Sequence, residues 1–166
     1  MDAKYWIDLL GLQEHPEGGY YREVYCSSET VSKSALPERF QSEHAFSTSI
    51  YYLLEYDDLS RFHRLHQDEI WHFYEGSAVM VHTLESKRHT VFRLGRNPAK
   101  GQLPMLVILH GTLFAAELEN KRSYALLGCT VSPGFKFEDF DQPSRSELTH
   151  RFPEHHDLIT RLTSAQ

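Results

Sequence analysis

The sequence consists mainly of short segments rich in aromatic and β-branched residues, separated by turn-forming residues. Asn97-Pro98, Gly101, His110-Gly111 and Pro133-Gly134 mark several of these turns. Many short strands at regular spacing are typical of an antiparallel sandwich or barrel, so we expect a mainly β fold. The expected strands cover residues 20–25, 46–54, 60–65, 69–74, 78–85, 89–94, 105–109, 113–119 and 124–131.

Helical patterns occur only near the two ends of the sequence. Asp2 can cap a short helix that runs to about Leu10, and Gly11 is a suitable stop. Residues 144–152 and 153–162 have helical spacing of their leucines, and Pro153 fits a first helical position. We expect one short N-terminal helix and two short C-terminal helices, packed outside the sheet.

Residues 26–43 form a polar stretch with Ser, Lys and Pro, which predicts a long exposed loop. A loop of this length is unusual in a compact domain. We expect it to be mobile, functional or part of a subunit contact.

Size and charge restrict the class of protein. The 166 residues fit one domain over 1–166, without repeats or an interdomain linker. The net charge of −6 argues against a nucleic-acid partner. The longest aliphatic run, Met105 to Leu109, is too short to cross a membrane, and no signal-peptide segment is visible, so a cytoplasmic location is expected. Cys26 and Cys129 form no disulfide framework or CxxC pair.

The stretch from Ser60 to Gly76 has the highest density of side chains that could bind a metal or a polar ligand. It contains three histidines and two adjacent carboxylates, namely His63, His66, His72, Asp68 and Glu69. Imidazole and carboxylate at this density suit either a metal site or a polar ligand pocket.

Four segments carry a resemblance to a known family. The spacing Glu-x6-Gly between Glu69 and Gly76 resembles the second half of the first cupin motif. The chain resembles the uncharacterised "cupin five" family, a domain-of-unknown-function branch of the RmlC-like cupin superfamily. That resemblance implies a cupin-type jelly-roll β-barrel and a homodimer, but no established reaction. It is carried by HPEGGYYRE at 15–23, DEIWHFYEG at 68–76, GCTVSPGF at 128–135 and RFPEH at 151–155.

The chain departs from the usual cupin metal motif. That motif has His-x-His before the glutamate, whereas His63 and His66 are spaced His-x-x-His. Phe114 stands at the histidine position of the second motif. His63 and Glu69 are therefore the only candidates for binding a metal, and two ligands are fewer than a stable zinc or iron site needs. The sequence identifies no cofactor and does not favour a divalent metal.

Strand alternation predicts what the barrel interior contains. Glu69, Trp71 and Phe73 share one face of their strand, and the side chains between them face the other way. If Glu69 points inward, then Trp71 and Phe73 do so too, and Phe114 joins them from another strand. An aromatic interior with a few polar groups is typical of a small-molecule pocket, in which we expect Trp71, Phe73 and Phe114 to contact the ligand.

Two further residues are candidate ligand contacts. Tyr21 and Arg22 follow Gly18-Gly19 and offer donors suited to an anionic or hydroxylated ligand. The alternative is an edge strand exchanged between subunits.

These patterns leave several functions open. The leading hypothesis is a small-molecule-binding cupin with a polar, sugar-like or nucleotide-like ligand in the barrel. A second hypothesis is a metal-independent isomerase or epimerase with His63 and Glu69 as catalytic residues, His63 acting as base and a nearby tyrosine as acid. A metal-dependent oxygenase and a non-catalytic storage-like cupin are further alternatives.

Overall fold

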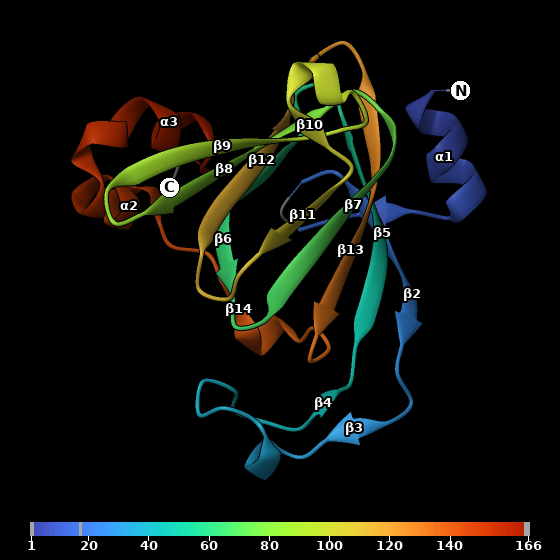
Figure 1. Cartoon of the computed structure of the whole chain (residues 1–166), viewed down its shortest axis with the longest axis vertical. Coiled ribbons are helices and arrows are strands. Elements are labelled where there is room, and N and C mark those ends of the chain that lie inside the picture. Colours follow the sequence, from blue (N-terminus) through green and yellow to red (C-terminus); the bar gives the residue numbers. More distant parts are fainter. Residues whose placement is uncertain (1, 17, 165–166) are drawn as a thin grey trace.

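Two six-stranded sheets face each other in the computed structural model, which describes residues 2–16 and 18–164 (Figure 1). The first sheet contains, in spatial order, β1 (Gln13–Glu14), β2 (Tyr20–Cys26), β5 (Thr48–Glu55), β13 (Tyr124–Ser132), β7 (Asp68–Gly76) and β11 (Met105–Ile108). The second contains β10 (Gln102–Leu103), β9 (Arg88–Leu94), β8 (Val79–Glu85), β12 (Leu113–Leu118), β6 (Leu59–Leu65) and β14 (Phe140–Asp141). The expected jelly-roll fold is confirmed.

The space between the sheets is filled by the inward-facing side chains of the strands. Leu54, Trp71, Val79, Phe114 and Leu127 belong to this main core, and each is at most 2% exposed. Burial of large side chains of this kind contributes roughly 1.5–3 kcal/mol each, so the core is the main source of stability.

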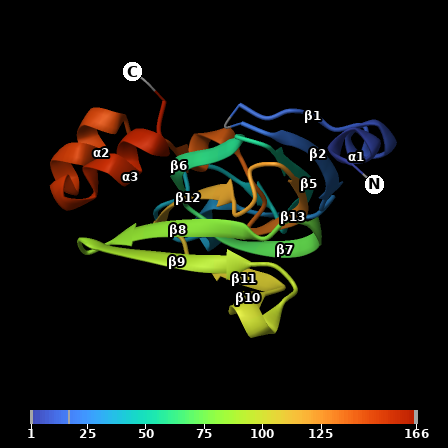
Figure 2. The same cartoon turned by 90° about the horizontal axis from the view of Figure 1, so that it is seen from above.

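The helices lie at opposite ends of the barrel (Figures 1 and 2). Helix α1 (Ala3–Leu10) begins after Asp2, whose side chain accepts a hydrogen bond from the backbone N–H of Tyr5 at 2.9 Å. It ends at Gly11, which has a φ of +61°. Helices α2 (Arg145–Arg151) and α3 (His156–Arg161) pack Leu148, Phe152, Ile159 and Leu162 against the second sheet. These helices occur as expected, except that residues 153–155 form a separate 3₁₀ turn, η4 (Pro153–His155).

Residues 27–47 leave the barrel as an extension, which we call the arm (Figure 1). The arm contains β3 (Thr30–Val31), paired with β4 (His44–Ala45), and the 3₁₀ turn η1 (Lys33–Ala35). Residues 26–43 are largely exposed, as expected, but Phe40 is 0% exposed, and His44, just beyond the expected loop, is 1% exposed. The arm is therefore attached to the domain through buried side chains.

Two further 3₁₀ turns complete the fold, η2 (Pro98–Lys100) and η3 (Phe137–Asp139). No helix within the described ranges is long and apolar enough to span a bilayer.

Candidate functional site

A cavity of about 320 Å³ opens between the inner face of the first sheet and strand β6. Its wall is mostly apolar and aromatic, and a few polar groups interrupt it. Pockets that bind small molecules have this composition.

The register of the first sheet explains which side chains reach the cavity. Trp71 lies opposite Cys129, and Cys129 lies opposite Ile50 on β5. In the next row, Glu69 lies opposite Val131. Because cross-strand partners share one face of a sheet, the two rows form a continuous floor.

Glu69 carries the carboxyl group of this floor, and it is 8% exposed. Burial raises the pKa of its carboxyl to about 7, although the neighbouring Trp71 and Cys129 favour the charged form and offset part of the shift. Glu69 Oε2 and Trp71 Nε1 are both buried, and neither has a partner at normal hydrogen-bond geometry among the described residues. The carboxyl is thus held near its ionisation point at neutral pH.

His63 reaches the cavity from β6 and is 6% exposed. Its Nδ1–H donates to the carbonyl oxygen of Arg61 at 2.7 Å, which places the lone pair of the neutral ring on Nε2. Burial lowers the pKa of His63 to about 4, so the imidazole is neutral at pH 7.

An irregularity in β6 determines the orientation of His63. Opposite β12, Phe114 pairs with His63, whereas Ala116 pairs with Ser60, so β6 contains one extra residue. The bulge allows Ser60 and His63 to face the same cavity although they are three positions apart. Strict alternation would have placed them on opposite faces.

Aromatic residues form the side wall beside β2. His15 packs edge-on against Tyr21 at 4.7 Å and against Tyr52 at 5.5 Å between ring centroids. Burial lowers the pKa of His15 to about 4, so this ring is also neutral at pH 7. The hydroxyl of Tyr52 donates to the carbonyl oxygen of Gly18 at 2.8 Å.

The segment 133–140 closes the cavity on another side, and we call it the aromatic loop. Phe135, Phe137 and Phe140 all line the cavity, and Phe140 stacks on His63 with ring centroids 5.1 Å apart. Phe137 is 62% exposed, which places it at the mouth.

The residues expected from the sequence separate into two groups. His63, Glu69, Trp71 and Tyr21 line one cavity. The other three, Phe73, Phe114 and Arg22, are not among the residues that line it.

The positions of these three residues have simple causes. Phe73 pairs with Leu127, one row beyond the cavity floor. Phe114 is 1% exposed and packs in the core against His63, with ring centroids 4.2 Å apart. Arg22 faces the other side of its strand and donates to the carbonyl oxygen of Leu10 at 2.8 Å.

The cavity residues do not fit the usual cupin metal site. Phe114 occupies the place beside His63 where another imidazole would be required. Among the described residues, three potential ligand atoms approach closely enough to hold a metal only at His44, Glu138 and Asp139, which do not line the cavity. Within the described part of the chain, Glu69 and His63 therefore lack the further ligands that a cupin metal site requires.

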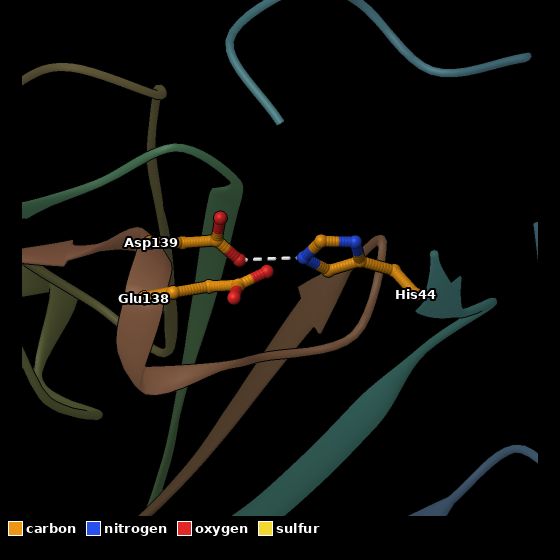
Figure 3. A group of neighbouring side chains, drawn as sticks. All are labelled: His44, Glu138 and Asp139. Carbon is orange, nitrogen blue, oxygen red and sulfur yellow. Dashed lines mark hydrogen bonds and ion pairs between the residues drawn. The ribbon is translucent and has the colours of Figure 1, made fainter. Parts of the chain in front are cut away.

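The His44 group connects the arm to the aromatic loop (Figure 3). His44 Nε2 lies 2.6 Å from Asp139 Oδ2, and both side chains are 0% exposed. His44 Nδ1–H donates to the carbonyl oxygen of Ser42 at 2.9 Å, and Gln67 Nε2 donates to the same Asp139 oxygen at 2.8 Å. Protein donors thus already surround Asp139 Oδ2, and the group fastens η3 to the arm and to the β6–β7 turn.

Several cavity residues were missed by sequence reasoning. His15, Tyr52 and Cys129 come from segments that had been recognised, but no local spacing signals their convergence. Tyr52 and Cys129 could have been found from the alternation of β5 and β13. The aromatic cluster of residues 135–140 is a visible sequence signal that a loop borders a pocket.

Comparison with known proteins supports the fold. The family described as "Cupin superfamily (DUF985)" matches residues 4–142. A solved Shewanella oneidensis protein is 31% identical, with 100% of this chain and 99% of that chain covered and a TM-score of 0.90. A hypothetical protein from Leishmania major is 27% identical, with 98% and 99% covered and a TM-score of 0.87.

A more distant likeness extends to an enzyme of the same fold. Oxalate decarboxylase from Bacillus subtilis is 15% identical, with a TM-score of 0.55, and the match covers 92% of this chain and 37% of the enzyme. At this identity the likeness concerns the fold alone. Among curated proteins, none is significantly similar in sequence. The family match over residues 4–142 shows that this chain belongs to the DUF985 family of the cupin superfamily.

Proposed function

We propose that this cupin binds a small molecule in its barrel cavity, with Glu69 and His63 as the polar contacts. The observation that carries the proposal is the 320 Å³ cavity, whose floor contains a buried carboxyl with a pKa of about 7. Burying a carboxyl without a full set of partners costs stability, and a ligand that hydrogen-bonds to it would offset that cost.

The polar groups of the wall suit a ligand with hydrogen-bonding groups on an apolar frame. The imidazole of His63 and the hydroxyls of Ser60 and Thr48 line the same space. A sugar-like ligand fits these groups. A nucleotide-like ligand fits less well, because none of the described lining residues is Lys or Arg to contact a phosphate.

Native mass spectrometry of gently purified protein, followed by screening of small polar compounds, tests this proposal. The variant Ile50→Phe adds bulk to the cavity wall and is expected to abolish binding. Val91→Phe adds the same kind of bulk to an exposed position on β9, outside the cavity, and should bind normally. Equal binding by the two variants would contradict a cavity site.

A proton-transfer reaction is the second candidate function. A carboxyl with a pKa of about 7 is well matched to act as general base or acid at neutral pH. His63, with a pKa of about 4, is a weaker base than the sequence hypothesis assumed. Glu69 is thus the better base of an isomerase or epimerase.

Incubation with aldoses and ketoses in D₂O tests this second function. An isomerase would introduce deuterium beside the carbonyl carbon, detected by proton NMR, and Glu69→Gln would lose the exchange. Exchange that persists in Glu69→Gln would exclude Glu69 as the base.

We also propose that the protein forms a homodimer. Strand β11 is an edge strand, and Met105, Val107 and Leu109, at alternate positions, are 51%, 47% and 60% exposed. An apolar row at a sheet edge is suited to contact with a second copy.

A further inference from the structure

The charged groups that line the cavity at neutral pH are all acidic. Glu69 lies in the floor, and Glu23 is an exposed carboxylate in the lining. The two lining imidazoles, His15 and His63, are neutral at pH 7 because burial lowers the pKa of each to about 4. Since none of the described lining residues is Lys or Arg, nothing in the described wall carries a compensating positive charge at neutral pH.

Aromatic rings line the same cavity as this carboxyl. Six of the lining residues are Tyr21, Tyr52, Trp71, Phe135, Phe137 and Phe140. The faces of such rings attract cations, most strongly Trp and Tyr, by about 0.5–2 kcal/mol per contact. Aromatic rings together with a carboxylate therefore suit an organic ammonium group.

Resting on the proposed function, we propose that the cavity selects organic ammonium ions over neutral or anionic molecules of the same shape. Such a cation would lie between Glu69 in the floor and the aromatic rings of the wall. Its charge would favour the ionised carboxyl, and its alkyl groups would contact the apolar lining.

Binding is then coupled to the loss of a proton from Glu69. Below about pH 7 a cation must displace the carboxyl proton, so affinity is expected to rise with pH up to that value and to level off above it. The other titratable groups around the site are Cys129 on β13, His63 on β6, Tyr52 on β5, His15 before β2, and Tyr21 and Glu23 on β2. Burial raises the pKa of the Cys129 thiol and lowers the pKa of each of the two imidazoles to about 4, so these three groups carry no charge at pH 7.

Three probes of matched shape test the charge preference by isothermal titration calorimetry at pH 8. They are choline, its neutral analogue 3,3-dimethylbutan-1-ol and the anion 3,3-dimethylbutanoate. We expect choline to bind at least tenfold more tightly than the alcohol, and the anion to bind most weakly. In Glu69→Gln the advantage of choline should disappear, whereas Glu29→Gln, at an exposed carboxylate outside the cavity, should retain it.

A second variant keeps the test informative if Glu69→Gln does not fold. Phe137→Leu changes an exposed ring at the mouth and preserves apolar bulk. It should weaken choline binding severalfold and leave the alcohol nearly unaffected.

Other outcomes overturn the inference in distinguishable ways. Equal affinity for choline and the alcohol would exclude charge selection while the cavity still binds ligands. Tighter binding of the anion than of choline would contradict the proposed selection of cations. If none of the three binds, ammonium selection is wrong, and the screen with Ile50→Phe separately decides whether the cavity binds any ligand.

Discussion

Glu69 combines two properties at the scale of a single residue. It lines a cavity that a small molecule can enter, and its burial makes the charged form of its carboxyl costly. Trp71 and Cys129 offset only part of this cost. A carboxyl with these properties lowers the stability of the free protein, and a ligand that pairs with it stabilises the protein.

The pH dependence of stability should reveal this cost. The carboxyl has a pKa of about 7 when folded against 4.5 ordinarily, so the unfolded chain loses its proton first as pH rises. The contribution of Glu69 to the free energy of unfolding is therefore fully present below pH 4.5. It falls by about 3 kcal/mol as the pH rises from 4.5 to 7. Urea denaturation at pH 5 and pH 8 should show that Glu69→Gln lacks this loss.

Glu29→Gln, at an exposed carboxylate, provides the control and should follow the native pH profile. The comparison between variants is needed because His15 and His63 act in the opposite direction. Their folded pKa values are lowered, so their contribution is present above pH 6.5 and is lost as pH falls toward 4. An unchanged profile in Glu69→Gln would show that this carboxyl is ionised without cost.

Sequence reasoning at this scale succeeded where strands are regular. Alternation along β7 placed Glu69 and Trp71 on one face, and both line the cavity. It could not place Ser60 beside His63, because the bulge in β6 depends on pairing with β12 rather than on local sequence.

At the scale of elements, the end of β7 depends on Gly76, the glycine of the Glu-x6-Gly motif. Its φ is +102°, and an added Cβ would lie 2.1 Å from the carbonyl oxygen of Tyr124. Gly101 also has a positive φ, of +70°, but an added Cβ there meets no atom within 4 Å. A side chain at Gly101 would therefore meet backbone strain alone, whereas a side chain at Gly76 would meet both backbone strain and steric overlap.

The predicted outcome follows from that difference. Gly101→Ala should cost about 1 kcal/mol of unfolding free energy from conformational strain alone. Gly76→Ala should cost at least about 2 kcal/mol more, because β13 must move away from β7. Urea denaturation of both variants measures this, and equal losses would mean that the β7–β13 contact is easily displaced.

The arm depends on the His44–Asp139 pair. Removing either side chain leaves a buried polar partner, so His44→Ala and Asp139→Ala should each cost about 3 kcal/mol in denaturation experiments. The double variant should cost clearly less than the sum. Lys4→Ala, which breaks the exposed pair with Asp8, should cost under about 1 kcal/mol. Additive losses at His44 and Asp139 would contradict their coupling.

Most element boundaries could be predicted because caps, turns and alternation are local signals, as Asp2 and Gly11 show for α1. The arm could not be predicted in the same way. Its polar composition indicates exposure, while its attachment depends on Phe40 and His44, whose partners are distant in sequence.

At the scale of the whole molecule, the exposed apolar row on β11 predicts self-association. Light scattering coupled to size-exclusion chromatography should give twice the chain mass of 19.4 kDa. Val107→Lys should shift the protein to the monomer, because a charge at the contact must be desolvated. Leu9→Lys, at an exposed position on α1, should remain dimeric. A native monomer would exclude this interface.

The aromatic loop contacts two parts of the molecule, the cavity and the arm. Phe137 borders the cavity, and Asp139, two residues later, is bonded to the arm. Because both contacts come from one short turn, we expect occupancy of the cavity and attachment of the arm to be thermodynamically linked. If a bound molecule makes detachment of the arm rarer by some factor, an attached arm must strengthen binding of that molecule by the same factor. Trypsin cleavage at Lys33 should slow when the cavity is filled, and the Asp139→Ala variant should lose this response.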